Sequence, residues 1–384
     1  MITRRLLGYQ RRLFHEWRML CYKYDGFRDH NYYSSLIKQL ENQPPKILIG
    51  PNSAEFGGVK HHIEAIERFS SLSVMLMPSK QYRSRLTPYH FTNVFNDHFK
   101  SFVPRGTRVL HSHVFPWFMN WCHDCSQHGL TWLHTYHLNY FPEHSEGHPD
   151  YWQLEINHAA TTLAKQATAR ISVSKWQVEY FKSTYDIDSI YIPNGVDVTI
   201  CDKANPKRFV RQTGLSNFVL YVGRNDPVKN PLEFVKLAQA NPKRNFVMIG
   251  GGLSSELLQK KYQLKPTNLK VLGSLSLQST QDAIAASDAV VVTSYREGLP
   301  TLVMEVMAAQ KPLVVPDEAG SAEAIGFGEG GFIYSLGNID DLSRKLEQSL
   351  QNCEIAERAR DRVLREYDWR VVAPQLDNLY SQFL

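Results

Sequence analysis

Residues 294–305 read SYREGLPTLVME and directly follow AVVVT, an apolar run at 289–293. A short apolar run ended by a glycine turn predicts a buried strand, and Gly298 allows the chain to turn after it. Pro300 suits the first position of the helix that follows, because proline lacks the N–H that this position leaves unpaired. The next residues then present backbone N–H groups to an anion at the helix N-terminus. These residues are Thr301, Leu302 and Val303.

Two glutamates, Glu297 and Glu305, stand eight positions apart around this turn. One falls in the loop and the other inside the helix, so both can border a ligand whose phosphates rest on the helix end. A carboxylate so close to an anion is costly unless it accepts hydrogen bonds from hydroxyl groups. The expected ligand therefore carries hydroxyls beside its phosphates, as a nucleotide sugar does.

Short β-rich runs alternate with longer helical stretches from residue 46 onward, which is typical of βαβ units around a parallel sheet. The first series of expected strands lies at 46–50, 73–77, 108–110, 130–134, 169–173 and 189–192. The second series lies at 218–222, 245–249, 269–272, 289–292 and 312–315. Residues 193–214 are dense in Pro, Asn, Gly and charge, which predicts a linker between the two series.

The fold class that follows is α/β, with two doubly wound domains. The chain of 384 residues is longer than one core usually fills. We expect an N-terminal domain at 1–195 and a C-terminal domain at 196–369. The last helix, 370–384, is free to pack back on the first domain. A composition of 43% hydrophobic and 21% charged residues excludes collagen, coiled coil and wholesale disorder.

The net charge of +5 is concentrated at the start of the chain. Residues 1–40 hold eight Lys or Arg against three acids, so the rest is neutral overall, which speaks against nucleic-acid binding. Apolar residues recur there at helical spacing between arginines, which predicts a basic amphipathic helix. Such a helix packs on its own domain or lies peripherally on a membrane. Because the sequence lacks a long apolar run and an apolar leader, we expect a cytoplasmic location, with the inner membrane face as the alternative.

Cations follow the first strand of the second series. Gly223 and Arg224 end the run FVLYVGR, and Lys229 comes five residues later. A guanidinium and an ammonium at the carboxyl end of such a strand suit a diphosphate, with a solvated surface pair as the alternative. In the first series, Gly57 and Gly58 precede an expected helix and permit a turn or the close approach of a phosphate.

Several motifs together resemble one family. They are EGLPTLVME, VGRNDPVKNP, MIGGGL at 248–253, IPNGVD at 192–197 and GGVKHH. In this order they are similar to the retaining glycosyltransferases of GT-B architecture, family 4, also described as glycosyl transferases group 1. The resemblance implies two Rossmann-like domains facing across a cleft, with the nucleotide sugar held mainly by the C-terminal domain and the acceptor by the N-terminal one.

Residue roles follow from the same resemblance. It assigns the donor diphosphate to the two cations, the ribose hydroxyls to Glu305 and the transferred sugar to Glu297. In LTWLHTYH it implies that His134 stands beside the reactive carbon of the sugar. Glu297 and His134 are thus the expected catalytic residues. The residues expected to bind the donor are Gly57, Gly58, Gly223, Arg224, Lys229, Gly298, Leu299, Thr301, Leu302, Val303 and Glu305.

The implied reaction moves a hexose from a nucleoside diphosphate sugar, preferably a UDP-sugar, to a hydroxyl of a glycan or lipid-linked acceptor in polysaccharide biosynthesis. Retention by front-face attack needs no strong protein base, and no cofactor or metal is expected. Two alternatives stay open: a nucleotide-sugar 2-epimerase of the same architecture, and a non-catalytic sugar-nucleotide binding module. Residues 136–151, aromatic and polar, are expected to form a loop, where acceptor choice would reside.

A zinc site is the alternative for one cluster of histidines and cysteines. His111 and His113 precede Cys122 and Cys125, and all four are zinc ligand types. The two cysteines are expected inside a helix that begins near Pro116, where a pair three residues apart is more often core. With five scattered cysteines in all, the sequence also offers no disulfide framework.

Overall fold

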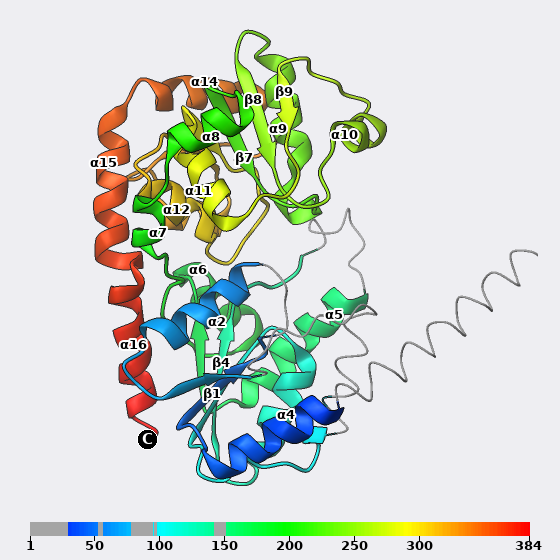
Figure 1. Ribbon diagram of the computed structural model, residues 1–384, viewed down its shortest axis with the longest axis vertical. Coiled ribbons are helices and arrows are strands. Elements are labelled where there is room, and N and C mark those ends of the chain that lie inside the picture. Colours follow the sequence, from blue (N-terminus) through cyan, green and yellow to red (C-terminus); the bar gives the residue numbers. More distant parts are fainter. Residues whose placement is uncertain (1–29, 53–56, 78–94, 96–97, 142–150) are drawn as a thin grey trace, which may run out of the picture. The chain divides into compact units, whose positions relative to one another are not determined.

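A computed structural model describes residues 30–52, 57–77, 95, 98–141 and 151–384 (Figure 1). The chain divides into two compact units. The first comprises the described residues within 1–134, together with 162–169 and 379–384, and the second comprises those within 135–161 and 170–378. Residues 30–42 are helical. Most of the basic segment at 1–40 lies outside the described residues, so its contact with a membrane stays a prediction.

The first sheet has six strands in the order β2-β1-β3-β4-β5-β6. The strands are β1 (Ile47–Gly50), β2 (Val74–Leu76), β3 (Val109–His113), β4 (Thr131–Tyr136), β5 (Ala169–Ser172) and β6 (Ile190–Tyr191). All six expected strands are confirmed. The predictions for β3 and β4 ended two or three residues too early. The reason is that β3 continues through His111, Ser112 and His113, which are polar but fully buried and so break the apolar pattern.

The second sheet also has six strands, in the order β12-β11-β10-β7-β8-β9. They are β7 (Phe218–Val222), β8 (Asn245–Ile249), β9 (Leu269–Val271), β10 (Ala289–Val291), β11 (Leu313–Pro316) and β12 (Phe332–Tyr334). The first five of these are confirmed and β12 was not predicted. The pairs are parallel, and β7 and β8 align from Phe218 opposite Asn245 to Val222 opposite Ile249. Two parallel doubly wound sheets of this kind confirm the α/β fold class.

Both faces of the second sheet are covered. Along β7, Phe218 and Leu220 belong to one buried cluster, whereas Val219 and Tyr221 belong to another. Successive side chains of a strand point to opposite faces, so both faces of β7 are buried. This explains why the strand reads as a continuous apolar run.

The helices surround these sheets, and none of those described is long and apolar enough to cross a bilayer. They are α2 (Gly58–Phe69), α4 (Pro116–Ser126), α5 (Tyr151–His158), α6 (Lys175–Tyr185), α7 (Val198–Asp202), α8 (Pro206–Thr213), α9 (Pro231–Ala240), α10 (Ser255–Tyr262), α11 (Leu277–Ala286), α12 (Thr301–Ala308), α13 (Ala319–Ala324), α14 (Ile339–Leu350), α15 (Cys353–Arg362) and α16 (Trp369–Ser381).

The stretch expected to be a linker contains two of these helices, α7 and α8. Asn205 caps α8 by accepting a hydrogen bond from a backbone N–H, and Gly214 ends the helix in a left-handed conformation. The Asn, Pro and Gly that suggested a loop are therefore the start and stop signals of a short helix. Arg208 of α8 forms an ion pair with Asp282 of α11, and the two helices pack together (Figure 1).

Candidate functional site

The loop at residues 294–300 leaves β10 and enters α12, as predicted. The helix begins at Thr301, and Pro300 is the N-cap rather than the first helical residue. Pro300 has an extended backbone, and its carbonyl oxygen accepts a hydrogen bond from Val303 N at 3.1 Å. The amides of Thr301 and Leu302 donate no hydrogen bond within the described part of the chain. The start of α12 therefore presents two free N–H groups and the positive end of its dipole.

Two of the residues predicted to bind the sugar donor form an ion pair with each other. Lys229 Nζ lies 2.5 Å from Glu297 Oε2, and the two side chains are 26% and 15% exposed. Glu297 Oε1 is buried and has no hydrogen-bond partner among the described residues. A buried acceptor of this kind normally has a donor. The site thus offers a cation and a carboxylate oxygen that is ready to accept a hydroxyl.

The turn that carries Lys229 is fixed by two neighbours. The hydroxyl groups of Tyr221 and Thr293 both donate to Lys229 O, at 3.2 and 3.0 Å. Gly223 leaves room for the Tyr221 ring, since a Cβ at Gly223 would lie 2.6 Å from the Tyr221 hydroxyl oxygen. Arg224 is mostly exposed and pairs with Asp226 at 2.9 Å. A partly buried lysine with a fixed backbone and an exposed arginine therefore follow β7.

Glu305 lies within α12 and is partly buried. Its Oε2 accepts a hydrogen bond from Gln281 Nε2 at 2.8 Å. Burial raises the pKa of Glu305 to about 7, although the Gln281 hydrogen bond opposes the shift. The Glu305 carboxyl group is therefore partly protonated near neutral pH.

The loop before α12 is also held from α6 and from residue 194, which belong to the same unit. Trp176 Nε1 donates to Gly298 O at 2.8 Å, and Asn194 Nδ2 donates to Leu299 O at 2.7 Å. A Cβ at Gly298 would lie only 1.9 Å from His137 O. Only glycine can occupy position 298 without moving the backbone of His137.

Residues 137–141 contribute to this site, and sequence reasoning noted them only as part of an acceptor loop. Asn157 holds the backbone of Tyr140 by two hydrogen bonds, of 2.8 Å to its N–H and 2.6 Å to its carbonyl oxygen. The guanidinium of Arg296 lies 4.5 Å from the centroid of the Phe141 ring. A signal was available, since His137 directly follows the carboxyl end of β4, where parallel sheets bind ligands. Residues 142–150 lie outside the described part of the chain.

His134, the predicted catalytic histidine, lies within β4 in the first unit. Its Nδ1 is 2.9 Å from Ser112 Oγ, which also accepts a hydrogen bond from Trp132 Nε1 at 2.8 Å. Burial lowers the pKa of His134 to about 3, so the imidazole is neutral. Gly57 is the N-cap of α2 with a φ of 132°, a conformation that favours glycine, and Gly58 begins the helix. The contact of these residues with a donor stays a prediction.

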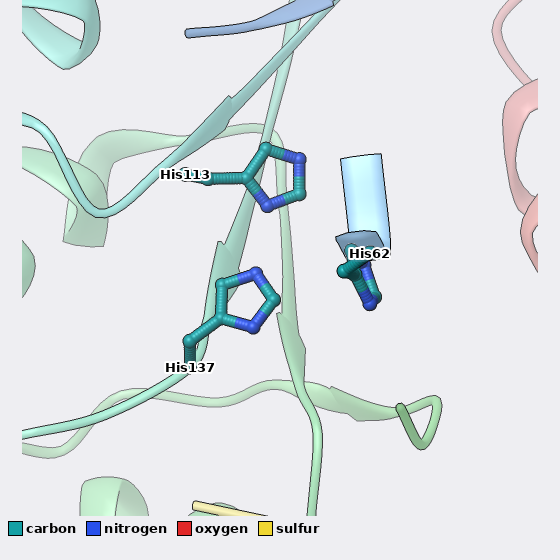
Figure 2. A group of neighbouring side chains, drawn as sticks. All are labelled: His62, His113 and His137. Carbon is teal, nitrogen blue, oxygen red and sulfur yellow. The ribbon is translucent and has the colours of Figure 1, made fainter. Parts of the chain in front are cut away.

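The cysteines considered for zinc lie in α4, in the expected helix. Burial raises the pKa of both thiols, that of Cys125 to about 12. His111 Nδ1 is 2.7 Å from the hydroxyl of Tyr380. Figure 2 shows the rings of His62 and His113, which meet edge to face with centroids 5.5 Å apart. His137, also drawn there, belongs to the second unit.

Comparison with known proteins places part of this chain beside one family. Residues 204–364 match the model of the family described as Glycosyl transferases group 1. This stretch of the chain is therefore similar to the group 1 glycosyl transferases. It is 27% identical over 237 residues to a phosphatidyl-myo-inositol mannosyltransferase of Mycobacterium tuberculosis, which covers 57% of this chain and 61% of that enzyme. The chain spans about half to three-fifths of the curated relatives that it matches first.

Solved structures identify the fold as GT-B. Sucrose-phosphate synthase of Thermosynechococcus elongatus has a TM-score of 0.71 at 18% identity, and the match covers 88% of this chain and 98% of that one. HepE of Anabaena, solved with UDP and glucose, has a TM-score of 0.69 at 18% identity and covers 88% of this chain and 99% of its own. At these identities the likeness establishes the architecture alone.

Proposed function

We propose that this chain is a retaining, metal-independent glycosyltransferase that uses a nucleoside diphosphate hexose, preferably a UDP-sugar. The observation that carries the proposal is the ion pair between Lys229 Nζ and the Glu297 carboxylate, in the loop that enters α12 at its free amides. Together they provide a positive group for a diphosphate and an acceptor for a sugar hydroxyl. HepE, a structural neighbour, has been solved with UDP and glucose, which supports this choice of donor.

In the proposed reaction the bond between the anomeric carbon and the β-phosphate oxygen breaks, and a bond from the acceptor oxygen to that carbon forms. The acceptor hydroxyl proton passes to the departing phosphate. Negative charge grows on the phosphate as the bond breaks, so cations and aligned N–H groups stabilise the transition state. Lys229, Arg224 and the start of α12 supply that charge, which a metal would otherwise provide.

The two acids have separate roles in this proposal. Glu297 exchanges its bond to Lys229 for hydroxyls of the transferred sugar, while Lys229 turns to the diphosphate. Glu305 accepts hydrogen bonds from the ribose hydroxyls, and the hydrogen bond from Gln281 orients its Oε2. Gly57 and Gly58 stay predicted contacts of the phosphates.

His134 and His137 are the two candidates for the position beside the reactive carbon of the sugar. The imidazole of His134 is engaged with Ser112, whereas His137 follows the end of β4 and its carbonyl contacts Gly298. We therefore propose His137 for this position. We propose that the acceptor is a hydroxyl of a glycan or lipid-linked acceptor, in polysaccharide biosynthesis.

Release of free nucleotide tests the function. The protein is incubated with UDP-glucose and a panel of glycan and lipid-linked acceptors, and the nucleotide and sugar products are separated by chromatography. Acceptor-dependent UDP and a product with retained anomeric configuration are expected, with unchanged rates in EDTA. An isomerised donor would indicate an epimerase, and donor binding without turnover would indicate a binding module; either result overturns the proposal.

A further inference from the structure

Helix α6 contacts the loop of the proposed donor site through one indole group. Trp176 Nε1 donates to Gly298 O at 2.8 Å, and both residues belong to the second unit. We propose that Trp176 is a positioning residue, which aims the backbone N–H of Leu299 at an oxygen of the donor's diphosphate-sugar group. The inference rests on the proposed function, because it assigns Leu299 N–H to the same ligand.

The geometry of the peptide bond carries the first step. The carbonyl of Gly298 and the N–H of Leu299 belong to one planar unit and point in opposite directions. A hydrogen bond that fixes Gly298 O toward α6 therefore fixes Leu299 N–H away from α6. The following carbonyl is held by Asn194 at 2.7 Å, and Pro300 has no N–H. Leu299 thus carries the last backbone donor before the amides that begin α12.

This amide lacks a partner in the protein. Leu299 is 3% exposed, and its N–H donates no hydrogen bond within the described ranges of the chain. Buried backbone N–H groups are almost always paired, by protein, water or ligand. The neighbouring carboxylate oxygen, Glu297 Oε1, is likewise buried and without a partner among the residues described. One donor and one acceptor, two residues apart in the loop, thus lack partners. This pair indicates a ligand that carries both an acceptor oxygen for the N–H and a hydroxyl group for the carboxylate.

Trp176 is itself held firmly in place. The carboxylate of Glu323, from α13, accepts hydrogen bonds from the backbone N–H groups of Lys175 and Trp176, at 2.7 and 3.0 Å. It thereby caps α6 at a point where the N-cap residue, Ser174, makes no side-chain cap bond. The Trp176 ring also contacts that of Tyr180, with centroids 5.9 Å apart. The indole therefore has little freedom to turn away from Gly298.

Helix α13 contacts the loop as well. A Cβ at Gly320 would lie 2.2 Å from Glu297 O and 2.4 Å from Gly298 O. The same short helix thus packs its glycine against the loop and uses Glu323 to cap α6. The hydrogen bond from Trp176 Nε1 to Gly298 O links α6 to the same loop and determines the orientation of the Gly298–Leu299 peptide.

The test compares two indole N–H groups. Trp176→Phe removes the N–H but keeps an aromatic ring. Trp121→Phe is the matched control, because Trp121 Nε1 donates to a backbone carbonyl, Phe102 O, at 3.0 Å in the first unit. Amide hydrogen exchange of the segment 294–303 is measured in the free proteins, and the affinities for UDP and UDP-glucose are measured by calorimetry.

We expect faster exchange at 294–303 in Trp176→Phe only, and affinity for UDP-glucose lower by about fivefold, the effect of one hydrogen bond. An equal loss for UDP assigns Leu299 N–H to a phosphate oxygen, and a loss confined to UDP-glucose assigns it to the sugar. Unchanged exchange and unchanged affinity for both ligands would overturn the inference while the proposed function stands. A wild-type protein that binds neither nucleotide would overturn the proposed function and the inference with it.

Discussion

The ion pair between Lys229 and Glu297 can be broken from either side. Lys229→Met keeps an unbranched side chain one atom shorter and removes the charge, so that both carboxylate oxygens of Glu297 are left without a partner. Glu297→Gln removes the opposite charge and leaves a neutral amide beside the lysine. The double variant has neither charge. The structure predicts that the double variant loses less stability than the sum of the losses in the two single variants.

The magnitude follows from burial. Breaking a fully buried pair from one side costs about 3–5 kcal/mol, and an exposed pair is worth about 0–1 kcal/mol. The side chains of Lys229 and Glu297 are 26% and 15% exposed, between these limits. We expect Lys229→Met to lower the free energy of unfolding by about 2 kcal/mol and the double variant to recover about half of this loss.

Urea unfolding of the four proteins at pH 7 measures the coupling free energy. A coupling of about 1–2 kcal/mol, reduced by added salt, is expected. Effects that add to within about 0.5 kcal/mol would refute the reasoning, because independent sites behave in this way. Addition of UDP gives a second readout, since its stabilising effect should be smaller in Lys229→Met than in wild type.

Three further predictions follow from the described contacts. Because the folded-state pKa of Glu305 is raised from 4.5 to about 7, the free energy of unfolding should fall as the pH rises through this interval. In urea unfolding from pH 4 to 8, Glu305→Gln should remove up to about 3 kcal/mol of this pH dependence. An equal pH dependence in the wild type and the variant would argue against a raised pKa at Glu305. His137→Ala should lower transfer at least about tenfold with a normal melting temperature, whereas His134→Ala should mainly lower that temperature; the reverse outcome would restore His134 to the catalytic position. Gln177 is fully buried, and neither polar atom of its side-chain amide has a partner among the described residues. Gln177→Leu should therefore raise the free energy of unfolding by about 1 kcal/mol in urea unfolding. A destabilised variant would show that the Gln177 amide does have a partner.

Much of the fold could be read from the sequence because parallel strands buried on both faces are continuous apolar runs. Residues 218–222 and 245–249 were predicted with their observed bounds. The failures have physical reasons. His111 and His113 are polar residues inside β3, and their burial depends on neighbours such as Tyr380, which is 269 residues away. The helices at 198–202 and 206–213 were hidden by their own capping residues.

The sequence could single out residues of the candidate site but not the contacts between them. Lys229, Glu297 and Glu305 were singled out because charge beside a glycine turn and a helix start has a chemical meaning. Their pairing could not be found, because the contact depends on how far a lysine side chain reaches across the end of the sheet. Trp176 and Asn194 were missed because they bond to the loop over separations of 122 and 105 residues, which no local pattern encodes.

A crystal structure of the protein with UDP tests the central claim most directly. We predict that Lys229 Nζ leaves Glu297 and lies within about 3 Å of a phosphate oxygen, with the diphosphate at the amides of Thr301 and Leu302. A diphosphate bound away from the start of α12, with the Lys229–Glu297 pair intact, would contradict the account.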